Sequence, residues 1–144
     1  MATLERAIQI AASAHAGQTD KAGQPYVLHP LRVMLTVTSQ QERMAAILHD
    51  VVEDTPITFE DLAEEGFHKD VIDAIRALTK FDGESRIDAA QRAAQNPIAC
   101  QVKLADVADN MDMSRLPNPT EKDYARLGEY EQVQAILLAE GDVL

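Results

Sequence analysis

The chain has 144 residues, of which 46% are hydrophobic, 26% are charged and 4% are aromatic. These proportions exclude a disordered chain, and the length fits one globular domain over residues 1–144 with a core of aliphatic side chains. The formal net charge of −11 argues against partners such as nucleic acid or an anionic membrane surface, because the protein would repel both.

Apolar residues recur at helical spacing along most of the chain, and no segment shows the alternation that is typical of a β-strand. In the first predicted helix, Leu4 and Ile8 are four residues apart, so both lie on the same face. Gly17 ends that helix, and a polar loop follows up to Pro25. Pro30 fits the first turn of the second helix, where its missing N–H group removes no hydrogen bond.

Capping signals delimit most of the later helices. Thr55 before Pro56 ends one helix, Thr58 with Asp61 resembles a capping box, and Asn96 can cap another helix. Together the signals predict helices over residues 3–16, 30–38, 41–53, 58–66, 70–79, 85–94, 97–113 and 120–139. The predicted fold class is therefore all-α, a single bundle of about seven or eight helices.

Cys100 is the single cysteine, so the chain cannot form an internal disulfide. It lies in an apolar run over residues 97–104, and we interpret it as a small buried hydrophobic residue rather than a reactive thiol. The N-terminus lacks the basic region and apolar run of a signal peptide, and no apolar stretch is long enough for a transmembrane helix. We therefore expect a cytoplasmic protein. The sequence leaves its oligomeric state open.

The segment Leu48–Thr55 carries the clearest chemical signal. On a helix, Glu53 lies one turn beyond His49, and Asp54 lies one turn beyond Asp50. Three carboxylates and an imidazole then gather near the negative end of the helix dipole, which costs stability unless a cation is bound. A solvated acidic helix end is the alternative. The apolar residues on both sides of the His-Asp pair favour an interior position, and with it a metal site.

Two further residues fit such a site. His29 lies at a junction between a loop and a helix, directly before Pro30. Asp106 lies on an otherwise apolar helix face, and a buried aspartate needs a cationic partner or several hydrogen bonds. Each of these residues alone would usually be structural. Together with His49 and Asp50 they supply two imidazoles and two carboxylates.

Five segments in this order resemble the HD-domain phosphohydrolases. Within that family the chain is similar to the hydrolase domain of bacterial alarmone synthetase/hydrolase proteins and to the stand-alone small alarmone hydrolases. The segments are His15–Gln18, Gly23–Pro30, Ala45–Thr55, Leu78–Lys80 and Lys103–Met111. A bare His-Asp pair means little, but the whole series in order is highly specific. The resemblance implies a helical HD-domain bundle.

The resemblance implies a metal site. Residues at four positions match the ligands of a single divalent ion, which is Mn²⁺ in this family: His29, His49, Asp50 and Asp106. Nitrogen and oxygen ligands without thiolates agree with Mn²⁺ and do not exclude Fe²⁺ or Zn²⁺.

The resemblance also implies catalytic and substrate-binding roles. Glu53 and Asp54 match the pair that activates and orients the attacking water, Lys21 matches a basic residue near the substrate phosphates, and Asn110 matches a residue that contacts the nucleotide. The implied activity is metal-dependent hydrolysis of a nucleotide pyrophosphate or phosphate ester, with ppGpp converted to GDP and pyrophosphate as the best candidate.

The chain departs from the family pattern in ways that leave the nucleotide base open. Asp20 and Val107 stand where the family commonly has arginine, and we expect Asp20 to influence the choice of nucleotide. Three alternatives remain: an enzyme of this class that acts on an adenine alarmone, a nucleotide sensor without turnover, and a purely structural helical module. We assign His15 to a structural or exposed position, and Arg126 and Tyr130 to packing rather than substrate contact.

Overall fold

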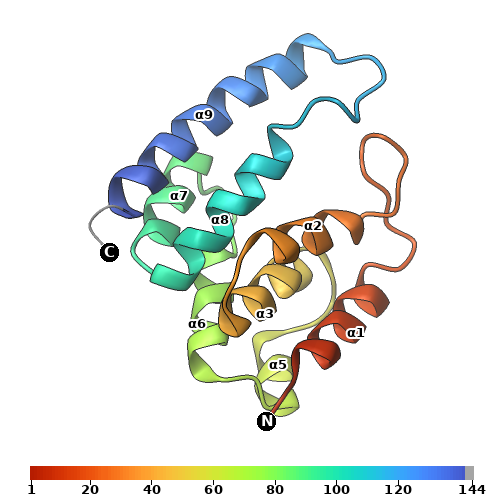
Figure 1. Ribbon diagram of the computed structural model, residues 1–144, viewed down its shortest axis with the longest axis vertical. Helices are drawn as coiled ribbons and strands as arrows, with labels where there is room; N and C mark the ends of the chain where they lie inside the picture. Colours follow the sequence, from red (N-terminus) through yellow and green to blue (C-terminus); the bar gives the residue numbers. More distant parts are fainter. Residues whose placement is uncertain (142–144) are drawn as a thin grey trace.

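The computed structural model describes residues 1–141, and over this range it contains nine helices and no strand (Figure 1). They are α1 (Leu4–Ala14), α2 (Leu28–Thr36), α3 (Gln40–Leu48), α4 (Val51–Asp54), α5 (Phe59–Glu65), α6 (Lys69–Leu78), α7 (Arg86–Ala94), α8 (Pro97–Asn110) and α9 (Glu121–Gly141). The predicted all-α class is confirmed. Among the described helices, none combines the length and the apolar character needed to cross a membrane.

The capping signals in the sequence operate as predicted. Oγ1 of Thr58 accepts a hydrogen bond from the Asp61 N–H group at 3.1 Å, and Oδ2 of Asp61 accepts one from the Thr58 N–H group at 2.9 Å. This capping box begins α5, and Gly66 ends it with a φ of +91°, a conformation that glycine adopts without strain. At the start of α8, Oδ1 of Asn96 accepts from the N–H group of Ala99 at 2.9 Å.

Helix α3 lies at the centre of the fold, packed against α1, α2, α6 and α8. Its last residues, from Ala45 to Leu48, are completely buried. A second buried cluster joins α7, α8 and α9 and includes Cys100 and Leu137. Cys100 is fully buried, which confirms that it packs as a small hydrophobic residue. The apolar end of α3 therefore delivers the next residues, His49 and Asp50, into the interior.

The helix that the sequence predicts over residues 41–53 is divided. Helix α3 ends at Leu48, α4 begins at Val51, and Asp50 between them has φ −101° and ψ −3°. Neighbouring residues on one continuous helix point about 100° apart. At this turn the two side chains converge instead, and Nε2 of His49 lies 3.0 Å from Oδ2 of Asp50. The break places two neighbouring residues in one site.

Two loops lie next to each other on one side of the molecule, at the right in Figure 1. The loop between α1 and α2 is closed by an isolated bridge between Thr19 and Pro25. The other loop connects α8 to α9. Nζ of Lys21 in the first loop lies 3.1 Å from Oδ1 of Asp123 in the first turn of α9. The two loops thus form a wall beside the end of α8.

Candidate metal centre and adjoining pockets

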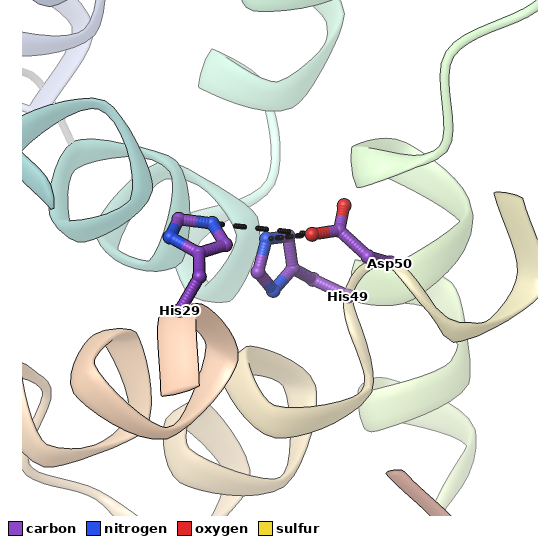
Figure 2. Close-up of side chains that lie close together, drawn as sticks. All are labelled: His29, His49 and Asp50. Carbon is purple, nitrogen blue, oxygen red and sulfur yellow. Dashed lines mark ion pairs between the residues drawn. The ribbon is translucent and has the colours of Figure 1, made fainter. Parts of the chain in front are cut away.

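The structure brings together all four residues that the sequence predicts as metal ligands. His29 comes from the first turn of α2, His49 and Asp50 follow α3, and Asp106 comes from α8. One atom from each of His29, His49 and Asp50 forms a group whose members lie within 4.8 Å of one another (Figure 2). Oδ1 of Asp106 lies 2.8 Å from Nε2 of His29 and 3.5 Å from Nε2 of His49.

These separations fit one small cation. Two ligand atoms bound at about 2.1 Å and at a right angle to each other lie about 3 Å apart. Nε2 of His49 is 3.0 Å from Oδ2 of Asp50, and Nε2 of His29 is 3.9 Å from the same oxygen. His29, His49 and Asp106 are also buried, with at most 6% of each residue exposed. The atoms therefore surround a largely buried point, to which the partly exposed Asp50 side chain (17%) also contributes.

The hydrogen bonds of the two histidines decide which ring nitrogen carries the lone pair. Nδ1 of His49 lies 2.5 Å from the carbonyl oxygen of Ala46, and Nδ1 of His29 lies 2.7 Å from Oδ2 of Asp109. Carbonyl and carboxylate oxygens only accept, so each Nδ1 carries the proton. Nε2 of each ring faces a carboxylate, at 2.8 Å for His29 and 3.0 Å for His49, so a ring is neutral with its lone pair on Nε2 only when a cation takes the place of the Nε2 proton. Nε2 of His49 is buried and lacks a hydrogen bond among the described residues.

The electrostatics of the group also favour a cation. Burial alone would lower the pKa of His49, but the charges of Asp50 and Asp106 outweigh it and raise this pKa well above its ordinary value. Burial would raise the pKa of Asp106, but the charges of Lys103 and His49 hold it well below the ordinary value. Two ionised carboxylates thus attract positive charge to Nε2 of both histidines. A proton or a metal ion satisfies that demand.

Asp50 links the metal-ligand group to the two predicted catalytic carboxylates. Oxygen atoms of Asp50, Glu53 and Asp54 form a second group whose members lie within 4.8 Å of one another. Oε1 of Glu53 accepts a hydrogen bond from the N–H group of Lys80 at 2.7 Å. Oδ2 of Asp50 accepts one from the hydroxyl of Tyr26 at 2.5 Å. The sequence prediction that His49, Asp50, Glu53 and Asp54 occupy one region therefore agrees with the geometry.

Lys103 balances part of this negative charge. Its Nζ atom donates to Oδ2 of Asp106 at 2.8 Å, while Oδ1 of Asp106 faces the histidines. Burial opposes the charged form, but Asp106 outweighs it and raises the pKa of Lys103, so the ammonium group stays protonated. Asn110 donates from Nδ2 to Oδ1 of Asp106 at 3.2 Å. Each oxygen of Asp106 thus has a defined partner.

Two adjoining cavities open around this centre. The larger one, of about 360 Å³, contains the predicted ligands, Glu53 and Asp54; we call it the histidine pocket. The second cavity, of about 220 Å³, lies beside the two loops and is lined by Lys21, Arg32, Arg115 and Arg126; we call it the arginine pocket. Four residues line both cavities: Tyr26, His29, Asn110 and Tyr130.

Lys21 and Asn110, the predicted substrate-binding residues, occupy different positions relative to the metal centre. Asn110 lies between the two pockets, whereas Lys21 lines only the arginine pocket and pairs with Asp123. Arg126 and Tyr130, which the sequence assigns to packing, also line the arginine pocket, and Tyr130 packs against the buried cluster of α7, α8 and α9 as predicted. Their helix carries too weak an apolar pattern for sequence reasoning to decide which face turns inward.

Asp20 has a role in its own loop. One of its carboxylate oxygens, Oδ1, accepts hydrogen bonds from the N–H groups of Ala22 and Gln24, both at 2.9 Å. The loop turns through Gly23, whose φ is +82°. The carboxylate of Asp20 therefore organises the loop that presents Lys21. Asp20 also lines the arginine pocket, and its influence on the choice of nucleotide stays a prediction.

Sequence reasoning missed several residues that support the centre. Tyr26 and Lys103 hold the two aspartates, and Asp109 holds His29. Lys103 lies three positions before Asp106, and Asp109 lies three positions after it. This spacing places the three side chains on one helix face, and it could have identified Lys103 and Asp109 from the sequence. His15 is buried, and its ring lies 5.1 Å from that of Tyr26, in agreement with a structural position.

The helices surround two buried imidazoles and two aspartates. The protein is therefore an all-helical protein with a site that can hold a divalent cation. The model of the HD domain family matches residues 7–143. The chain belongs to the HD domain family.

The chain resembles proteins of alarmone metabolism. It is 37% identical over 97 residues to the bifunctional (p)ppGpp synthase/hydrolase SpoT of Escherichia coli, which covers 65% of this chain and 14% of that protein. It is 36% identical over 125 residues to the GTP pyrophosphokinase of Streptomyces coelicolor, which covers 78% of this chain and 15% of that protein. The chain therefore spans less than a fifth of these curated relatives.

A solved structure has a similar fold over almost the whole chain. It is a metazoan ortholog of SpoT that hydrolyses ppGpp, and it superposes with a TM-score of 0.75 and 27% sequence identity. The match covers 99% of this chain and 93% of that chain.

Proposed function

We propose that this protein is a metal-dependent phosphohydrolase that removes the 3′-pyrophosphate of ppGpp and leaves GDP and pyrophosphate. The observation that carries the proposal is the convergence of His29, His49, Asp50 and Asp106 beside the carboxylates of Glu53 and Asp54. The names of the relatives and the activity of the similar solved structure support the choice of ppGpp. We also propose that residues 1–144 form one domain.

The proposed cofactor is one Mn²⁺ ion per chain, held by His29, His49, Asp50 and Asp106. Imidazole nitrogen and carboxylate oxygen suit Mn²⁺, and the same donors also accept Fe²⁺ or Zn²⁺. When bound, a divalent ion lowers the pKa of a coordinated water and polarises the phosphate that is attacked.

Glu53 and Asp54 are the proposed proton acceptors for the attacking water. Desolvation in the pocket, together with the charges of Asp50 and Glu53, raises the pKa of Asp54 to about 6. A carboxylate with such a pKa takes up and releases protons near neutral pH more readily than an ordinary aspartate does. The hydrogen bond from the Lys80 N–H group holds Glu53 in place, and the Tyr26 hydroxyl holds Asp50.

The arginine pocket is the proposed site for the nucleotide portion of the substrate. The protein has a net charge of −11, so an anionic substrate needs a local group of cations. Lys21, Arg32, Arg115 and Arg126 are the candidate cations, beside a wall that includes Met113 and Leu116. Each of them pairs with an aspartate of the same lining, so a substrate phosphate binds here by taking the place of these carboxylates. Guanidinium groups can bind phosphate oxygens through paired hydrogen bonds and can stack on a purine. Asn110 and Tyr130 connect this pocket to the proposed metal centre.

A direct test uses purified protein, ppGpp and added Mn²⁺, with GDP and pyrophosphate measured by anion-exchange chromatography. We expect both products in equal amounts, and we expect no turnover after the metal is removed with a chelator. The His49→Ala variant is the matched control for contaminating phosphatase. Mn²⁺ binding with no hydrolysis of ppGpp or of its adenine counterpart would favour a nucleotide sensor. Absence of divalent metal binding would favour a structural module.

A further inference from the structure

The imidazole of His29 is held at both ring nitrogens by one face of α8. Nε2 lies 2.8 Å from Oδ1 of Asp106, and Nδ1 lies 2.7 Å from Oδ2 of Asp109. Asp106 and Asp109 are three positions apart on the helix, so they project from the same face. Rotation of the ring would break the contact with Asp109, and the bound orientation is therefore selected by two residues of the same helix.

Asp109 is in turn held by two arginines. Arg32, three positions after His29 on α2, donates from Nε to Oδ1 at 2.8 Å and from Nη2 to Oδ2 at 3.1 Å. Nη2 of Arg115 donates to the backbone carbonyl oxygen of Asp109 at 2.9 Å and lies 3.5 Å from Oδ2 of its carboxylate. The carboxylate therefore has little freedom to turn away from His29. Its side chain is only 12% exposed.

The partners of Asp109 also fix its charge. Its two oxygens face three donor atoms, Nδ1 of His29 at 2.7 Å and Nε and Nη2 of Arg32 at 2.8 and 3.1 Å, an arrangement that suits an ionised carboxylate. An ionised carboxylate can only accept hydrogen bonds, so Nδ1 of His29 carries a proton. When a cation replaces the proton between Nε2 and Asp106, which are 2.8 Å apart, the ring is neutral and its lone pair is on Nε2.

We propose that Asp109 is the positioning residue of His29, which fixes the tautomer and the ring orientation that present Nε2 to a divalent cation. This inference rests on the metal centre of the proposed function and extends it to a residue outside the ligand set. A carboxylate behind a ligating histidine also makes the imidazole a stronger ligand.

The second histidine provides an internal comparison. Nδ1 of His49 faces the uncharged carbonyl oxygen of Ala46 rather than a carboxylate. The two ligands are therefore oriented by different partners, and loss of Asp109 should disturb His29 while His49 keeps its orientation. This difference can be observed separately for each ring.

The first test measures Mn²⁺ affinity by competition with a chelating dye. We expect Asp109→Leu to weaken binding by about 10–100-fold, the usual effect of losing a partner that orients a ligand. Asp109→Asn should weaken binding less, because its amide oxygen can still accept from Nδ1. The matched control is Asp112→Asn, which removes a carboxylate that pairs with Arg115 at 3.0 Å, and its Mn²⁺ affinity should equal that of the parent.

A second variant separates positioning from anchoring. Arg32→Gln removes the ion pair between α2 and α8 but leaves the contact between Asp109 and His29. We expect this variant to melt at a lower temperature while it retains most of its Mn²⁺ affinity. If Arg32→Gln lost as much affinity as Asp109→Leu, Asp109 would act only by holding the two helices together, and the inference would be overturned.

A third measurement reports the tautomer directly. In Zn²⁺-loaded protein with ¹⁵N-labelled histidine, NMR should show a proton on Nδ1 of His29 in the parent, and this signal should change in Asp109→Asn but not in Asp112→Asn. The inference is overturned by an unchanged His29 signal, or by Mn²⁺ affinity within about twofold of the parent in a folded Asp109→Leu variant. A parent that binds Mn²⁺ without hydrolysing ppGpp would overturn the proposed activity alone.

Discussion

Nε2 of His29 lies 2.8 Å from Oδ1 of Asp106, although the two residues are 77 positions apart in the sequence. The contact joins the first turn of α2 to α8. The lone pair of Nε2 and the negative charge of the Asp106 carboxylate repel each other at this distance. The contact is favourable only when a proton or a metal ion lies between the two atoms. Metal occupancy and the packing of α2 against α8 are therefore linked.

The first prediction follows from this link. Mn²⁺ should raise the melting temperature of the parent protein, because a ligand that binds only the folded state stabilises it by about 2.7 kcal/mol at one hundred times its Kd. His49→Ala and Asp50→Ala should abolish the metal-dependent rise. The measurement is a thermal melt with Mn²⁺ and with chelator. A parent whose melting temperature responds to neither would contradict the proposed metal site.

The second prediction separates binding from chemistry at Glu53. Glu53→Gln removes the proton acceptor but keeps an oxygen that can accept the hydrogen bond from the Lys80 N–H group. The kcat for ppGpp should fall by roughly 10²–10⁴-fold while Mn²⁺ binding is retained. Glu60→Gln, at an exposed position on α5, is the matched control and should behave as the parent. Equal kcat values for Glu53→Gln and the parent would make Glu53 a bystander.

The third prediction concerns the pH dependence of stability. The pKa of Asp54 is raised from 3.8 to about 6 in the folded protein, first by desolvation and then by the charges of Asp50 and Glu53. Since the folded state holds this proton more tightly than the unfolded chain, ionisation of Asp54 destabilises the fold as the pH rises from about 4 to about 6.

Asp54→Asn should therefore raise the melting temperature of the metal-free protein above about pH 6 and leave it unchanged below about pH 4. Thermal melts in chelator across this range provide the measurement. Asp82→Asn removes a carboxylate from an exposed turn and should show no such dependence. A difference between parent and Asp54→Asn that stays the same at every pH would show that the charge of Asp54 is not the cause.

The fourth prediction concerns the loop that carries Lys21. Asp20 accepts two backbone hydrogen bonds within this loop, so Asp20→Arg should disorder the loop and lower kcat/KM for ppGpp and its adenine counterpart by similar factors. Asp20→Asn keeps an acceptor oxygen and should retain most activity. Lys21→Ala should raise KM for both nucleotides. A changed ratio of the two kcat/KM values in Asp20→Arg would instead show that Asp20 contributes to recognition of the base.

Local signals in the sequence predicted much of the helical structure. The capping box of Thr58 and Asp61, the cap at Asn96 and the proline in the first turn of α2 all act within a few residues, so they could be identified without the tertiary structure. The division between α3 and α4 could not, because Val51 and Val52 continue the apolar pattern across the break. Packing of the buried end of α3 decides where the helix stops.

The sequence by itself determined the all-α class, the caps and the series of residues that identifies the HD family, since these depend on spacing along the chain. Only the tertiary structure decided which residues support the predicted ligands. Asp109 reaches His29, and Arg126 and Asp20 both line the arginine pocket, where Asp20 also accepts two hydrogen bonds from its own loop. Each of these depends on the direction in which a side chain leaves its helix or loop, and that direction is set by contacts between segments far apart in the sequence.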